Sequence, residues 1–317
     1  MTVIAYVFPG QGSQSVGMLQ ELSARYPLII DLFTSVSQRV GYDVWDLVQN
    51  GPQERLNQTE QTQVAMLTAD VAVYQLLQQL GAPRASIMAG HSLGEYAALV
   101  CAGAIDLPDA AELVGLRGKL MQQNVPLGQG AMAAIVGLTD AQVLELCATA
   151  TTATHQVTPA NYNAIGQVVI AGHTPAVEKA IALADEMGAR MAVNIPVSVP
   201  CHCPLLAQAS EIFGEELRKA PFKTPIVPVI SNVDLSIYQS EEQIKTLLTH
   251  QLCEPVRWVE TIQMMKNKGV ELLIECGPGK ILSGLTKRID KTLAAMSVND
   301  QSSLELALTA LQNQDKK

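Results

Sequence analysis

The chain has 317 residues, of which 48% are hydrophobic and 16% are charged, and its formal net charge is -9 at pH 7. This composition is typical of a globular protein of one or two domains with a substantial core, and it excludes a disordered chain. The acidic balance argues against nucleic-acid binding, and no apolar run reaches the roughly 18 residues that a membrane helix needs.

The N-terminal stretch and the cysteines indicate where the protein works. Residues 1–8 contain no basic region and run directly into Pro9-Gly10, so they do not resemble a signal peptide. The six cysteines are scattered along the chain, so we expect free thiols and a cytoplasmic location. Cys201-His202-Cys203 has no second ligand cluster at finger-like spacing, so we expect no metal site.

Short apolar and helical segments alternate over the first part of the chain. Val3–Phe8 predicts a central strand. The small and amide residues of Pro9–Gln14 after it favour a loop whose backbone N–H groups face a ligand, and a flexible surface turn is the alternative. Residues 16–50 predict helices in pieces, residues 59–80 predict one long helix, and residues 109–123 predict another.

The pentapeptide Gly90-His91-Ser92-Leu93-Gly94 reads Gly-x-Ser-x-Gly between a strand-like run, 85–89, and a helix-like run, 95–103. Strand, sharp turn and helix form the context of a nucleophile elbow, which exposes the serine hydroxyl at a helix N-terminus. The unpaired N–H groups there favour a developing oxyanion. A glycine-rich turn whose serine only caps the helix is the alternative.

Residues 128–196 form a compact pattern of short elements in the order β-α-β-β-α-β. The expected strands are 131–136, 157–163, 167–171 and 189–195, and the expected helices are 139–150 and 175–187. This order is that of ferredoxin-like domains. We therefore expect a small domain at 128–196, inserted between the two parts, 1–127 and 197–317, of a larger catalytic domain.

The rest of the chain returns to alternating strands and helices. We expect strands at 225–231, 270–275 and 293–298, and helices at 205–219, 244–251, from Cys253 onward, at 280–289 and after Asp300. His202 lies in an extended, proline-rich segment of the larger domain. That position suits a general base, and a structural histidine is the alternative.

A serine on an elbow with a histidine in reach can form an acyl-enzyme. The N–H groups of Leu93 and of the Gln11 loop are candidates for stabilising the oxyanion. No clear acid is found between Ser92 and His202 in chain order, where an α/β-hydrolase would supply one, so we expect a dyad whose histidine is oriented by another group, such as a backbone carbonyl. Arg117 needs an anionic partner if it is buried, and a snorkelling surface arginine is the alternative.

Five segments, in the same order and over essentially the whole chain, resemble the malonyl-CoA:acyl carrier protein transacylase family. They are Phe8–Gln14, Gly90–Glu95, Arg117-Gly118, Val199–His202 and Gln251–Trp258. The resemblance implies an α/β fold in which a larger α/β-hydrolase-like domain, with a mostly parallel sheet, carries an inserted ferredoxin-like α+β domain. It also implies an active site in the gap between the two.

The resemblance assigns roles to individual residues. It implies that Ser92 is the nucleophile, that His202 is the base, and that Arg117 binds the malonyl carboxylate. By the same resemblance Gln11 and Leu93 form the oxyanion hole, and the backbone carbonyl of Gln251 orients the histidine. Three further residues are expected to bind the substrate: His91, and on the coenzyme A side Asn161 and Gln167.

The implied activity is transfer of a malonyl group from malonyl-CoA to the phosphopantetheine thiol of acyl carrier protein, for fatty acid biosynthesis and without a cofactor. A trans-acting acyltransferase of a polyketide synthase and a thioesterase or esterase stay open. A non-catalytic carrier-binding subunit is a further alternative, against which Ser92, His202 and Arg117 argue together. Cys201, just before the histidine, leaves the exclusion of methylmalonyl groups open.

Basic residues outnumber acidic ones between positions 264 and 291. They are Lys266, Lys268, Lys280, Lys287, Arg288 and Lys291, against Glu271, Glu275 and Asp290. Such an excess can steer an acidic carrier protein toward the enzyme. A solvated helix face is the alternative interpretation.

Overall fold

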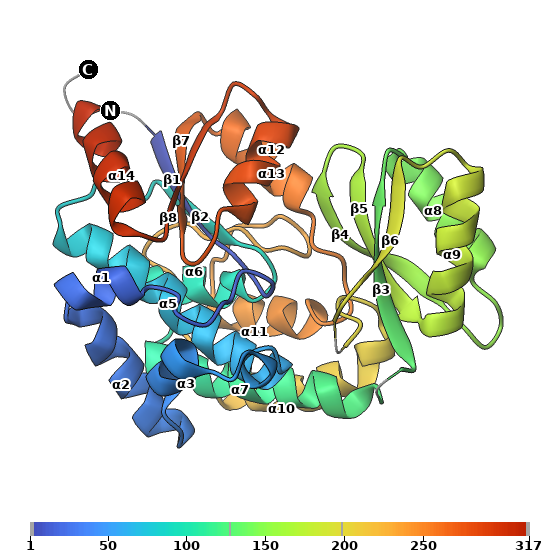
Figure 1. Cartoon of the computed structure of the whole chain (residues 1–317), viewed down its shortest axis with the longest axis horizontal. Coiled ribbons are helices and arrows are strands. Elements are labelled where there is room, and N and C mark those ends of the chain that lie inside the picture. The colour runs from blue at the N-terminus through green and yellow to red at the C-terminus, as the bar shows by residue number, and fades with distance from the viewer. Residues whose placement is uncertain (1–2, 127, 198, 315–317) are drawn as a thin grey trace.

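Two four-stranded sheets, one parallel and one antiparallel, organise the molecule (Figure 1). The computed structural model describes residues 3–126, 128–197 and 199–314. Leu127, at the predicted domain boundary, lies outside the described residues. The arrangement is a mixed α/β fold, which confirms the predicted fold class at this level.

The first sheet is parallel throughout. Its strands, in spatial order, are β2 (Ile87–Gly90), β1 (Val3–Phe8), β7 (Val270–Cys276) and β8 (Ala294–Val298). Strand β1 is central, and its alternate side chains enter two different cores: Ile4, Tyr6 and Phe8 enter one, and Ala5 and Val7 enter the other. Burial on both faces explains why β1 is apolar at every position.

Helices cover both faces of this sheet. The core on the Tyr6 side is built with α1 (Gln20–Arg25), α2 (Leu28–Val40), α3 (Val44–Asn50), α4 (Gln53–Leu56), α5 (Thr59–Gln79), α6 (Gly94–Cys101), α7 (Leu107–Asn124), α10 (Ala207–Lys219), α11 (Glu241–His250) and α14 (Gln301–Gln314). The core on the Val7 side is built with α12 (Trp258–Asn267) and α13 (Ile281–Ile289). No helix of the described ranges is long and apolar enough to cross a membrane.

The second sheet is antiparallel and lies beside the first, at the right of Figure 1. Its strands, in spatial order, are β4 (Val157–Ala164), β5 (Gln167–His173), β3 (Gly130–Val136) and β6 (Met191–Ile195). Helices α8 (Asp140–Ala150) and α9 (Thr174–Glu186) cover one face, where Ile135 and Ile170 are buried. Met132 and Val169, on the other face, line a cavity between the sheets.

Backbone hydrogen bonds tie the antiparallel sheet to the segment between α11 and α12. The N–H of Val256, which follows α11, donates to the carbonyl of Ala160 at 2.9 Å, and the N–H of Tyr162 donates to the carbonyl of Val256 at 2.9 Å. These bonds tie the edge strand β4 to the segment that leads into α12. The antiparallel sheet is therefore held in place at the rim of the cavity.

Two predicted elements are wrong. Residues 225–231, expected as a strand, form only isolated bridges, from Val229 to Met88 and from Ile230 to Ile237, because Pro225 and Pro228 lack the N–H that a strand ladder needs. The helix expected from Cys253 begins at Trp258 instead, because the N–H groups of Cys253 and Glu254 close a turn on the His250 carbonyl and Val256 bonds to β4.

Candidate active site

Ser92 lies on the sharp turn between β2 and α6, with a φ of 53° that non-glycine residues rarely adopt. Both neighbouring glycines are required by close packing. A Cβ atom at Gly90 would lie 1.8 Å from the carbonyl carbon of Gly94, and one at Gly94 would lie 2.0 Å from the carbonyl oxygen of Phe8. The turn has the geometry of a nucleophile elbow.

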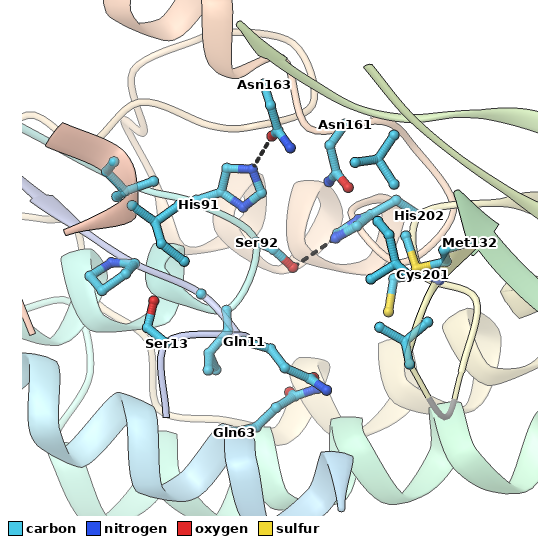
Figure 2. Close-up of a pocket in the computed structure, with 18 of the residues that line it drawn as sticks. Gln11, Ser13, Gln63, His91, Ser92, Met132, Asn161, Asn163, Cys201 and His202 are labelled. Atoms are coloured by element: carbon cyan, nitrogen blue, oxygen red, sulfur yellow. Dashed lines mark hydrogen bonds between the residues drawn. The ribbon is translucent and has the colours of Figure 1, made fainter. Parts of the chain in front are cut away.

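Ser92 and His202 form a hydrogen-bonded pair (Figure 2). The Ser92 Oγ atom lies 2.7 Å from His202 Nε2, and His202 Nδ1 lies 2.7 Å from the backbone carbonyl oxygen of Gln251. Because a carbonyl only accepts, Nδ1 carries the proton and Nε2 is left to accept from the serine hydroxyl. Burial and the Arg117 charge lower the pKa of His202 to about 3, so the imidazole is neutral and able to take a proton.

Arg117 is buried beside this pair, with 1% of its surface exposed. Its Nη1 donates to Gln63 Oε1 at 3.0 Å, and its Nη2 donates to Gln251 Oε1 at 3.0 Å and to Ser92 Oγ at 3.3 Å. Its Nε has no hydrogen-bond partner, and no ion pair of the described residues includes it. A buried guanidinium held only by neutral groups favours an incoming anion.

Two backbone N–H groups remain free to stabilise a negative charge. The N–H of Ser92 is taken by Asn232 Oδ1 at 2.7 Å, and that of Gly94 donates to the His91 carbonyl at 3.0 Å. The N–H groups of Leu93 and Gln11, by contrast, have no hydrogen-bond partner among the described residues, and both residues line the cavity. Free donors beside a nucleophile are the requirement of an oxyanion hole.

The cavity has a volume of about 250 Å³, and most of the predicted site residues line it: Gln11, His91, Ser92, Leu93, Arg117, Asn161 and His202. Gln251 lies behind His202 rather than on the cavity wall. Gln167 lies outside the cavity, where its side chain accepts a hydrogen bond from Arg288 at 2.6 Å. Its assignment to the coenzyme A side therefore stays a prediction.

Four polar residues of the site were missed at the sequence level: Gln63, Glu95, Asn163 and Asn232. Asn163, on β4, lies 2.8 Å from His91 Nε2 and so connects the elbow to the antiparallel sheet (Figure 2). Asn232 donates to the Gly90 carbonyl at 2.7 Å while accepting from the Ser92 N–H. Only Glu95 had a signal in the sequence, its place directly after the elbow motif.

The Cys201 thiol and the metal-ligating side chains of the described residues offer no alternative chemistry at the site. Burial raises the pKa of the Cys201 thiol, on the cavity wall, to about 11, so it is protonated at neutral pH and a poor nucleophile. In the part of the chain that the structure describes, no three His, Cys, Asp or Glu side chains gather in a way that could hold a metal ion. The chemistry of the cavity therefore centres on Ser92.

Comparison with known proteins agrees with this geometry. Residues 5–316 match the acyl transferase domain family. The malonyl CoA-acyl carrier protein transacylase of Escherichia coli K12 is 51% identical over 308 residues, which cover 97% of this chain and 99% of the relative. The chain belongs to the malonyl CoA-acyl carrier protein transacylase family. It is an acyltransferase, as the resemblance implied.

Solved members of this transacylase family share the fold. The transacylase of Coxiella burnetii is 46% identical, with a TM-score of 0.96 and 98% of each chain covered. A malonyl-transacylase solved in complex with its type II PKS acyl-carrier protein is 48% identical, with a TM-score of 0.96 and with 98% of this chain and 100% of that chain covered. The mixed α/β architecture with one parallel and one antiparallel sheet is therefore that of the family.

Proposed function

We propose that this acyltransferase moves a malonyl group from malonyl-CoA to the phosphopantetheine thiol of an acyl carrier protein. The observation that carries the proposal is the buried Arg117 guanidinium, which makes no ion pair with any described residue. Its Nη2 atom lies 3.3 Å from the Oγ atom of a serine that is paired with a histidine. A malonyl thioester offers a carboxylate and a reactive carbonyl a short distance apart. The names of the relatives support the same substrate and acceptor.

The first half-reaction forms an acyl-enzyme. Ser92 Oγ attacks the thioester carbonyl carbon while its proton passes to His202 Nε2, and the oxyanion is bound by the N–H groups of Gln11 and Leu93. The carbon–sulfur bond then breaks, and the departing coenzyme A thiolate takes the proton from the imidazolium. In the second half-reaction the carrier thiol gives its proton to His202 and attacks the malonyl ester carbonyl. The bond from that carbon to Ser92 Oγ then breaks, and Oγ takes the proton back from the imidazolium.

Arg117 would select the acyl group. Its guanidinium can hold the free malonyl carboxylate through two parallel hydrogen bonds. An acetyl group would enter the same cavity without satisfying the buried cation, and sites that leave a buried polar group unpaired reject such analogues strongly. We assign His91 to substrate binding, Asn161 and Gln167 to the coenzyme A side, and the Gln251 carbonyl to orienting His202.

The domain organisation is part of the proposal. Residues 1–127 with 197–317 would form an α/β-hydrolase-like domain, and residues 128–196 a ferredoxin-like domain. The elbow between β2 and α6 supports the first assignment. The β-α-β-β-α-β order and the antiparallel strand order β4-β5-β3-β6 support the second.

Every proton and acyl transfer in this mechanism is assigned to a group of the chain or its substrates, so the proposal includes no cofactor. We place the enzyme in the cytoplasm and in fatty acid biosynthesis. A polyketide synthase pathway is the second candidate, because the relative solved with a carrier protein has a type II PKS partner. Transfer rates to purified carrier proteins of both kinds distinguish the two pathways.

Intact-mass spectrometry tests the central step. The enzyme incubated with malonyl-CoA should carry a malonyl adduct, Ser92→Ala should carry none, and added carrier protein should remove the adduct by becoming malonylated itself. An adduct that persists in Ser92→Ala, or one lost to water faster than to carrier protein, contradicts the proposal. Arg117→Ala should lose the preference for malonyl-CoA over acetyl-CoA, and an unchanged preference contradicts the role of Arg117.

A further inference from the structure

A buried carboxylate lies behind the serine–histidine pair. Glu95, on the first turn of α6, is 0% exposed and has the chain order Ser92, Glu95, His202 that α/β-hydrolases use for nucleophile, acid and base. It does not touch His202, because His202 Nδ1 is bonded to the Gln251 carbonyl. An acid is thus present in the expected chain order, but another residue, Gln251, lies between it and the histidine.

Gln251 connects this acid to the rest of the site. Its Nε2 donates to Glu95 Oε2 at 2.6 Å and to the Ser92 carbonyl at 3.0 Å, and its Oε1 accepts from Arg117 Nη2 at 3.0 Å. The side-chain amide therefore has its oxygen toward the cation and its nitrogen toward the carboxylate, an orientation that both charges favour. Its backbone carbonyl accepts the hydrogen bond from His202 Nδ1–H.

We propose that Glu95 is a positioning residue of the acyl transfer reaction, a buried acid that acts on His202 and Arg117 through Gln251. The inference rests on the proposed function and adds a residue to it. In the ionised state Glu95 fixes the amide of Gln251, and its charge stabilises the imidazolium that forms when His202 takes the serine proton. Because these groups are buried, solvent screens that charge much less than at a surface.

The surroundings of Glu95 decide its ionisation. Burial raises its pKa to about 7, against the lowering effects of the Tyr238 hydroxyl at 2.5 Å, the Gln251 amide, the Asn232 N–H and the Arg117 charge. The hydroxyl of Tyr96, also buried, is a further titratable group close to Glu95. Glu95 therefore gains a proton as the pH falls through about 7, and acylation of Ser92 should slow over the same range.

Single-turnover acylation by malonyl-CoA, followed from about pH 6 to about pH 9, tests the inference with Glu95→Gln. The acylation rate of the wild type should fall as the pH drops through the pKa of Glu95, which gives the pH–rate profile an acid limb, and Glu95→Gln should lack this limb. At the alkaline end the variant should be slower by about 10-fold to 100-fold, less than the roughly 10⁴-fold loss on neutralising an acid in direct contact with a catalytic histidine. An unchanged limb in Glu95→Gln, or slower acylation with the limb retained, overturns the inference.

Tyr238→Phe is the second variant. If circular dichroism shows that Glu95→Gln is unfolded, Tyr238→Phe alone tests whether Glu95 is a positioning residue. It keeps the carboxylate but removes a hydroxyl that stabilises the ionised form, so the acid limb should move to higher pH. A limb that stays in place contradicts the role of Glu95. A wild-type enzyme that forms no malonyl adduct contradicts the proposed function, whereas an adduct with pH profiles identical in all three proteins contradicts this inference alone.

Discussion

Replacing Asp70 by asparagine should stabilise the protein, and the gain should grow as the pH rises. Asp70 lies in the middle of α5, is 0% exposed, and has no hydrogen-bond partner for either carboxylate oxygen among the described residues. It packs beneath the loops after β1 and β7, where a Cβ atom at Gly277 would lie 1.9 Å from its Oδ1 and 3.1 Å from Pro9. Burial, with the nearby Glu275 as a second cause, raises its pKa well above the usual value.

The sign and the magnitude follow from this raised pKa. The folded state holds the Asp70 proton more tightly than the unfolded state, so its contribution to stability is complete below the unfolded-state pKa and is lost as the pH rises through the folded-state pKa. Each pH unit in that window removes about 1.4 kcal/mol. Between about pH 5 and about pH 8 the wild type should therefore lose stability through Asp70 at up to this rate, a loss that asparagine cannot undergo.

Urea unfolding of the wild type and of Asp70→Asn, at both ends of this pH range, measures the effect. The difference in the free energy of unfolding should increase with pH in favour of the variant. Asp185→Asn, which removes one exposed carboxylate from α9, is the matched control for the loss of a charge. A stability difference between wild type and Asp70→Asn that is the same at all pH values would refute the reasoning, because it would mean that Asp70 does not hold a proton in the folded protein.

Three further predictions follow from single contacts. Asn232→Ala leaves the nucleophile N–H without its acceptor and should lower the free energy of unfolding by about 1–3 kcal/mol, together with kcat/KM for malonyl transfer; an unchanged kcat/KM would contradict it. Gly94→Ala should destabilise by about 3 kcal/mol or more in urea unfolding, whereas Gly284→Ala, with nothing within 4 Å of its new Cβ, should stabilise by up to about 1 kcal/mol. If the exposed Lys287 and Lys291 dock the carrier protein, reversing both charges should slow transfer to it about 10-fold at low salt while acylation by malonyl-CoA is unchanged. Equal carrier rates at all salt concentrations would remove the patch from consideration.

The local motifs were the predictable part of this molecule. The elbow could be predicted because strand, turn and helix follow one another within a few residues around Ser92, and the β-α-β-β-α-β pattern because its elements are contiguous in the chain. Residues 225–231 misled because their apolar composition resembles a strand, although two prolines remove donors from it. The start of α12 was predicted too early because Val256, shortly before it, bonds to a distant strand, β4.

The supporting polar residues could not be predicted, because each acts across a long stretch of sequence. Asn232 meets Ser92 from 140 positions away and Glu95 from 137 positions away, and Gln63 meets Arg117 from 54 positions away. In a single sequence an amide at such a distance is indistinguishable from a surface residue. Only the fold shows that it is buried against a cation, a carboxylate or the nucleophile.

The proposed oxyanion site depends on the register of two strands rather than on either loop alone. Elbow hydrogen bonds use the N–H groups of Ser92 and Gly94, so the elbow offers only that of Leu93, and a second donor must come from another strand end. Strands β1 and β2 are parallel neighbours with Phe8 opposite Gly90, so their following loops leave the sheet at the same edge. A Cβ atom at Gly10 would lie only 2.7 Å from the His91 carbonyl oxygen, so a residue without a side chain allows the Gln11 loop to close on the elbow. A larger residue at position 10 should therefore impair the chemistry of Ser92 while leaving the serine and its histidine in place.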